Sequence, residues 1–172
     1  MVGDPTVSAA SLTLTSIMKI FGQYQAYRSS KIRETDKGLR EEIGRRLEMI
    51  QNHINTLENR FLASKNASGI EVLNRARLTA ESFRQDASFG PTGTTDATST
   101  APSLKKGQIK AMMDHDLEVL KRLVEATHLV NALVDKSSTE EGVEKASLMG
   151  FEQKLVGVQN RFADRVSYLA KL

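Results

Sequence analysis

The residues with the clearest chemical potential are the three histidines and the carboxylates near them, because the chain has no cysteine. Glu125 and His128 form an E-x-x-H pair, the spacing that ferritin-like di-iron bundles use on a single helix. Such a site needs a second pair of the same kind, but no carboxylate stands three positions before His53 or His115. We therefore expect no metal site.

A second cluster, Asp114, His115 and Asp116, places two carboxylates beside a histidine. Residues i and i+2 of a helix point to different sides, so we expect a solvated helix face here rather than a metal site. The chain also lacks the glycine-rich patterns of phosphate-binding loops and the G-x-S-x-G pattern of nucleophile elbows. We expect no catalytic residue, no cofactor and no enzymatic activity.

The composition suits a soluble helical domain. The chain has 172 residues, of which 40% are hydrophobic and only 5% aromatic, with no tryptophan; this length fits one domain. The net charge is +3, and residues 1–33 hold four basic side chains against one acidic side chain. The remainder of the chain is balanced, so we do not expect a nucleic-acid partner. The absence of cysteine and of a secretory signal favours a cytoplasmic or peripheral-membrane location.

Large apolar residues recur every three or four positions along residues 43–61 and again along 151–169. A stripe of this kind needs a neighbouring helix at a shallow crossing angle of about 20°. The two stripes have nearly the same spacing and are natural partners, either within one chain or between two copies. The predicted interaction seam consists of Ile43, Leu47, Ile50, Ile54, Leu57, Phe61, Phe151, Leu155, Val158 and Phe162.

The periodic segments predict an all-α fold, an elongated bundle of about four long helices with coiled-coil-like packing in one domain, 1–172. Helices are expected at residues 6–29, 38–64, 69–88, 104–136 and 139–172, and the first two could be one broken helix. Thr, Ser, Gly and Pro dominate residues 88–103, which predicts a flexible connection. Residues 138–141 fit a capping box at the start of the last helix.

The N-terminal segment 5–27 has a single charge, Lys19, and is long enough to cross a bilayer. Six of its residues are Ser or Thr, which argues against stable spanning. It is either a core helix or an amphipathic helix that meets a membrane or a partner. In outline, a weakly apolar first helix leading a bundle resembles cell-death and pore-forming domains, without a family-specific motif. The contact residues would be Leu14, Ile17, Phe21, Tyr24, Arg28, Lys31 and Arg33.

These observations favour a non-enzymatic interaction or scaffold module that binds a protein partner or self-associates through its heptad-like seams as a homo-oligomer. The alternative is a membrane-active helical bundle, of the pore-forming or cell-death type, that uses residues 5–27.

Overall fold

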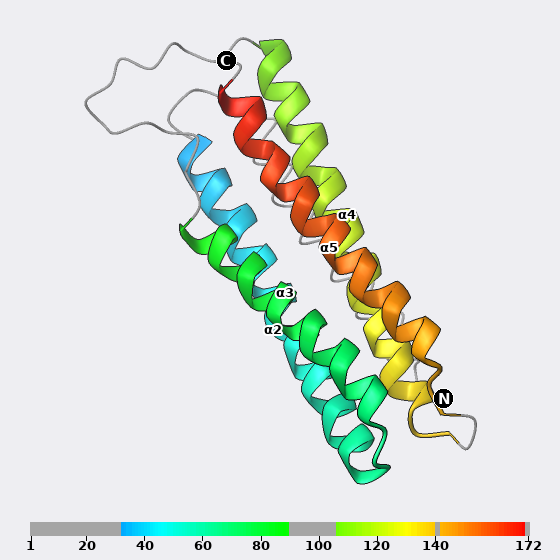
Figure 1. Ribbon diagram of the computed structural model, residues 1–172. Helices are drawn as coiled ribbons and strands as arrows, with labels where there is room; N and C mark the ends of the chain where they lie inside the picture. Colours follow the sequence, from blue (N-terminus) through cyan, green and yellow to red (C-terminus); the bar gives the residue numbers. More distant parts are fainter. Residues whose placement is uncertain (1–31, 90–105, 140–141, 171–172) are drawn as a thin grey trace, which may run out of the picture.

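The computed structural model describes residues 32–89, 106–139 and 142–170. These residues form four helices and no strand: α2 (Ile32–Ala63), α3 (Ala67–Phe89), α4 (Lys106–Lys136) and α5 (Lys145–Ala170). The helices lie side by side along their length (Figure 1), and α2 extends over about 48 Å at about 1.5 Å per residue. The prediction of an all-α, elongated bundle is confirmed. The helix expected at residues 6–29 lies outside the described residues.

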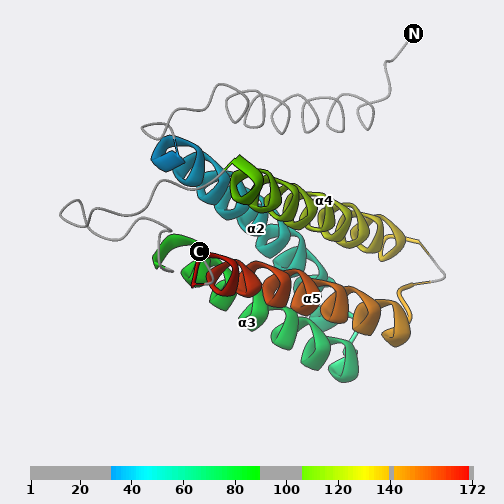
Figure 2. The same cartoon turned by 90° about the horizontal axis from the view of Figure 1, so that it is seen from above.

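The four helices alternate in direction. α2 and α4 run one way along the bundle, and α3 and α5 run the other way (Figure 1). α2 packs against α3 and α4, and α5 packs against the same two helices, so α2 and α5 lie at opposite corners of the bundle (Figure 2). α3 ends and α4 begins at the same end of the molecule. The residues predicted to connect them, 88–103, fall outside the described residues except for Ser88 and Phe89, which belong to α3.

Two helix starts differ from the predictions by more than two residues. α2 begins at Ile32 rather than residue 38, so residues 32–37, which separate the first two predicted helices, are already helical. α5 begins at Lys145, not at residue 139. The reason is that the hydroxyls of Ser137 and Thr139 donate to carbonyls at the end of α4, at 2.7 and 2.8 Å. These side chains therefore complete the previous helix, and the backbone carbonyl of Glu144 accepts the first hydrogen bonds of α5.

The turn between α2 and α3 is short, and hydrogen bonds hold its residues in place. Lys65 adopts a positive φ of 55°, and the amides of Lys65 and Asn66 donate to the carbonyls of Leu62 and Phe61. This is the Schellman pattern that ends a helix. The side-chain oxygen of Asn66 then accepts from the amide of Gly69 at 3.1 Å and caps α3. One residue, Asn66, thus ends α2 and starts α3, which fixes the two helices as a hairpin.

All four helices contribute to one hydrophobic core. Most of its side chains are Leu, Ile, Val and Phe, but α3 also contributes Ala76, Ala80 and Ala87. Small residues let neighbouring helices approach closely, while large residues such as Phe83 fill the centre of the bundle. The ring of Phe83 lies 5.4 Å from that of Phe162 on α5. This ring contact joins α3 to α5 within the core.

We predict that Gly69→Ala destabilises the protein by about 1–3 kcal/mol, the usual cost of overpacking. A Cβ on Gly69 would lie 2.6 Å from the ring of Phe61, which is itself buried. Urea unfolding measures the change. Gly44→Ala is the matched control, because a Cβ there meets no atom within 4 Å and alanine favours the helix. Equal stability of the two variants would contradict the prediction.

Candidate functional site: an uncharged strip on α5

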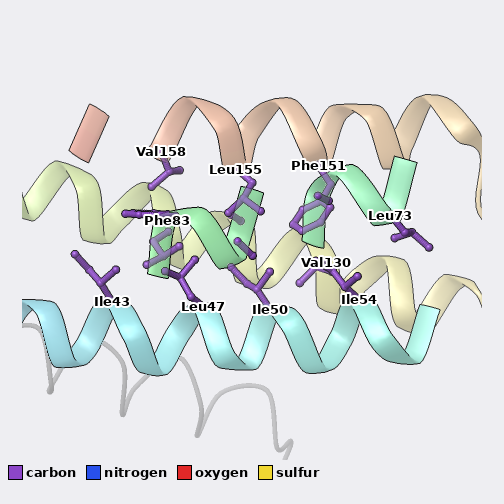
Figure 3. Packing of buried hydrophobic residues seen from close by; sticks show 14 of the residues in the cluster. Ile43, Leu47, Ile50, Ile54, Leu73, Phe83, Val130, Phe151, Leu155 and Val158 are labelled. Carbon is purple, nitrogen blue, oxygen red and sulfur yellow. The ribbon is translucent and has the colours of Figure 1, made fainter. Parts of the chain in front are cut away.

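The structure places all ten residues of the predicted interaction seam in the interior of the chain. Each is at most 6% exposed. The side chains of α2 and those of α5 point toward one another across the core (Figure 3). The two helices are not neighbours, however; each packs against α3 and α4. The two stripes therefore meet through the centre of a four-helix core, so the chain's own helices occupy the seam and any partner has to contact another surface.

The seven residues proposed for membrane or partner contact cannot be placed. Leu14, Ile17, Phe21, Tyr24, Arg28 and Lys31 lie outside the described residues, and Arg33 belongs to α2 without a described side chain. Within the described part of the chain, no helix combines the length and the apolar character that crossing a bilayer requires.

The histidines and their neighbouring carboxylates do not converge. Glu125 is exposed and pairs with Lys154 of α5 at 2.8 Å, while His128 is exposed and His53 is half-buried on another helix. No group of three or more possible metal-binding side chains occurs in residues 32–89, 106–139 and 142–170. Glu125 of the E-x-x-H pair is therefore used in an ion pair between α4 and α5.

The prediction of a solvated face for residues 114–116 is wrong for two of the three. Asp114 is exposed, but Asp116 and His115 are buried, at 0% and 3% exposure. Arg165 of α5 makes this burial tolerable, because its Nε and Nη2 donate to the two carboxylate oxygens of Asp116 at 2.9 and 3.1 Å. His115 Nε2 lies 2.9 Å from the carbonyl oxygen of Arg161. These contacts join α4 to α5 inside the core.

We predict that Asp116→Asn costs about 3–5 kcal/mol, because it leaves a buried arginine opposite a neutral amide. Replacing both partners, as Asp116→Leu with Arg165→Met, removes both charges and should cost much less than the single change. Urea unfolding of the two variants tests this. A double variant as unstable as the single one would show that the pair does not act through charge compensation.

A second buried ionic group lies on α2. Glu42 accepts hydrogen bonds from Arg46 at 2.7 Å and from Arg45 at 2.8 and 3.0 Å, and the Arg46 side chain is almost fully buried. Burial by itself would raise the pKa of Glu42, but the hydrogen bonds and positive charges of Arg45 and Arg46 outweigh it and hold this pKa below its ordinary value. The ionised form of Glu42 therefore stabilises the folded chain.

The pH dependence follows from the lowered pKa of Glu42. A group whose pKa is lower in the folded state contributes stability above its unfolded pKa of about 4.3, and this contribution is lost as the pH falls through the folded value. We predict that Glu42→Gln lowers the free energy of unfolding at about pH 7, and that the difference from wild type shrinks below about pH 4. Urea titrations across this range measure it. A difference independent of pH would contradict the assignment.

The outward side of α5 is the feature of the described surface that the core does not explain. Eight exposed positions recur along it with helical spacing over 18 residues, and none carries a charge: Ala146, Met149, Gly150, Gln153, Val156, Gly157, Asn160 and Ala163. We call this set the α5 strip. Met149 and Val156 are 39% and 37% exposed, and a Cβ on Gly150 or Gly157 would meet no atom within 4 Å. The strip is smooth, neutral and partly apolar.

Contacts with α3 on one side and α4 on the other hold α5 so that the α5 strip faces away from the bundle. Toward α3, Arg75 binds Glu152 through two hydrogen bonds of 2.7 and 3.1 Å. Toward α4, Lys154 pairs with Glu125. The charges that flank the middle of the strip, Glu152 and Lys154, are thus already paired within the chain.

The other helices differ in their exposed sides. Lys37, Glu41 and Arg45 lie on α2, and charged side chains of both signs are exposed on α3 and α4 as well. The exposed positions of α2 from Met49 to Asn59 are also uncharged, but asparagine amides dominate them and hydrate readily. The strip is visible in the sequence as a helical repeat of uncharged residues, which is weaker than the repeat of large apolar residues in the seam. Our sequence interpretation missed it because large apolar residues dominate that signal.

No known protein family, no curated protein and no solved structure matches the chain.

Proposed function

We propose that the chain is a non-enzymatic helical interaction module and that it binds a protein partner through the α5 strip. The observation that carries the proposal is the strip itself: eight exposed helix positions without a charge, in a chain of which 26% is charged. An exposed helix face is normally charged, since charged side chains hydrate well and prevent association. Neutral, partly apolar faces are typical of surfaces that another helix covers.

The arrangement of the core supports the same proposal. The four helices bury their large apolar stripes against each other, and this core supports α5 from the inner side. Cross-helix contacts hold α5 on both of its sides, and Gln159 adds hydrogen bonds to Ser82 and Asp86 of α3 at 3.0 and 2.8 Å. A rigid helix loses little conformational entropy on binding.

We predict that a double change, Met149→Glu with Val156→Glu, dissociates the complex that the chain forms in its own cells. Covering a carboxylate without a counter-charge costs several kcal/mol, and both side chains are exposed, so the fold tolerates them. Size-exclusion of cell extracts with antibody detection measures the apparent mass. Asn52→Glu with Asn55→Glu, on the uncharged side of α2, is the matched control.

Two outcomes would contradict this proposal. The wild-type chain could elute from the extract at its own mass of 19.0 kDa, which would mean that it has no stable protein partner. The complex could also survive the strip variant and dissociate with the α2 control, which would place the contact on α2.

Membrane activity is the second candidate function, supported by the single charge in residues 5–27. It requires these residues rather than α5. Co-sedimentation with anionic lipid vesicles tests this function. Binding of the full chain and of the α5 strip variant, but not of a chain lacking residues 1–27, would favour it over the first.

A further inference from the structure

The side of the bundle formed by α2 and α4 contains a buried charge whose hydrogen bonds are incomplete. Arg46 of α2 is only 2% exposed. Its Nε donates to Glu42 at 2.7 Å, but its Nη2 is also buried and has no hydrogen-bond partner among the described residues. A buried N–H group without an acceptor destabilises a fold, so native structures nearly always supply one. We therefore looked for the segment that reaches this side chain.

Glu42 and Arg46 lie on the side of α2 that faces α4. Arg60 follows Glu42 by 18 residues, which is five complete helical turns, so the two residues lie on one line along α2. Arg60 binds the carbonyl of Val134 of α4. The line that carries Glu42 therefore borders α4, and the two helices are neighbours along it (Figure 2).

Two apolar side chains of α4 lie at the height of this charged pair. Leu117 is two residues, or about 200° around the helix, from His115, which binds α5, so Leu117 lies on the side of α4 away from α5. Val124 follows on the same line seven residues later, and both side chains are only partly buried. α2 and α4 run in the same direction, and Arg60 contacts residues 74 and 77 positions later. Leu117 is therefore level with Glu42.

Met49 of α2 is level with Val124 by the same offset, and it is 39% exposed. It follows Glu42 by seven residues, so it lies on the line that borders α4. We call the set formed by these side chains the α2–α4 face: Glu42, Arg46, Met49, Leu117 and Val124. This face combines incompletely buried apolar side chains with a buried donor that needs an acceptor.

We infer that residues 5–27 of the same chain dock on the α2–α4 face as a helix antiparallel to α2. The first argument is their attachment. α2 begins at Ile32, ten residues or about 15 Å before Glu42, and a helix of 23 residues spans about 35 Å, so the segment reaches the whole face. A segment tethered this closely has an effective concentration in about the millimolar range, which favours it over a separate partner.

The composition of residues 5–27 is the second argument. Leu14 and Phe21 are seven residues apart, as are Ile17 and Tyr24, which is the spacing that a shallow helix contact with Leu117 and Val124 requires. The six Ser and Thr hydroxyls and the two Gln amides of the segment are acceptors for the buried arginine. A segment with a single charge also adds little desolvation cost.

The other long segment outside the described helices does not suit the face. Residues 90–105 contain one large apolar residue, Leu104, so they cannot cover Met49, Leu117 and Val124 together.

Docking has a consequence for membrane contact. The apolar stripe of residues 5–27 cannot face lipid and the α2–α4 face at the same time, so any membrane contact through these residues requires their release from α2 and α4. The inference does not depend on the α5 strip, because α5 lies at the corner of the bundle opposite α2.

Cysteine pairs in the purified full chain test the placement, since the chain has no cysteine of its own. An antiparallel return through a turn at residues 28–31 brings residue 10 level with residue 49. We expect a short bismaleimide to link Ala10→Cys to Met49→Cys within one chain at least about tenfold faster than it links Ala10→Cys to Val156→Cys.

Val156 is the matched control position. It is 37% exposed, close to the value for Met49, and it lies at the same height on the opposite corner, because its neighbour Lys154 pairs with Glu125. Equal rates for the two cysteine pairs would overturn the inference. A product with twice the mass of the chain, in place of the link within one chain, would also overturn it and show that a second copy occupies the face.

Hydrogen exchange of the full chain tests the same contact without cysteines. At a dilution where the chain has its monomer mass of 19.0 kDa, the amides of residues 5–27 should exchange at least about tenfold more slowly than in the variant Met49→Glu with Val124→Glu. Met149→Glu with Val156→Glu, on α5, should leave this protection unchanged. The amides of α3 report whether the fold is intact, and if the first variant exposes them, Met49→Glu alone replaces it.

Two exchange results would overturn the inference: fast exchange of residues 5–27 in the wild-type chain, or slow exchange only after anionic lipid vesicles are added. The second result would show that lipid, and not the α2–α4 face, orders the segment. Neither result concerns the binding of a protein partner to the α5 strip.

Discussion

Closure of the apolar seam within one chain is the constraint on which the rest of the structure depends. Ten regularly spaced side chains of α2 and α5, from Ile43 to Phe162, are removed from water by packing across a core that α3 and α4 complete. Burying each large side chain is worth about 1.5–3 kcal/mol, so this packing dominates the stability of the bundle. It also removes the most apolar surface of the described helices from contact with any partner.

The polar groups in the bundle act at places where helices need orientation rather than additional hydrophobic area. Arg40 of α2 donates to the carbonyl of Ala87 at 2.8 Å, and Arg60 donates to the carbonyl of Val134 and to the hydroxyl of Ser137. α2 thus has one arginine near each end, and each binds carbonyls at the C-terminal end of a neighbouring helix, where cations are favourable. Together with the buried pair Asp116–Arg165, these contacts fix which helices are neighbours.

The sequence predicts the helices well because their apolar residues recur with the helical period. The residues from Ile43 to Phe61 are found as a buried stripe, since burial on one side of a helix leaves that pattern. The order of the helices around the core is not predictable in this way. α2 and α5 have matching stripes, yet they lie at opposite corners of the bundle. Four helices that share one core all need apolar residues at the same spacing, whichever of them are adjacent, so the spacing does not identify the neighbours.

Other features depend on contacts between residues distant in the sequence. Asp116 reads as a solvated carboxylate until Arg165, 49 residues later, is brought beside it. The predicted start of α5 is wrong because Thr139 suits either helix end; in the structure its hydroxyl donates to the carbonyl of Lys136. The α5 strip is the opposite case, a local pattern that the sequence contains in full, and its neutrality becomes meaningful once the stronger apolar stripe is known to face inward.

The most direct test of intramolecular closure is the concentration dependence of unfolding. Urea denaturation of the chain with Met149→Glu and Val156→Glu, followed over about a hundredfold range of protein concentration, separates folding of one chain from assembly of two. If the seam closes within one chain, the midpoint stays constant throughout this range. A midpoint that rises with protein concentration would show that α2 and α5 of different copies complete each other's core, and would contradict the account.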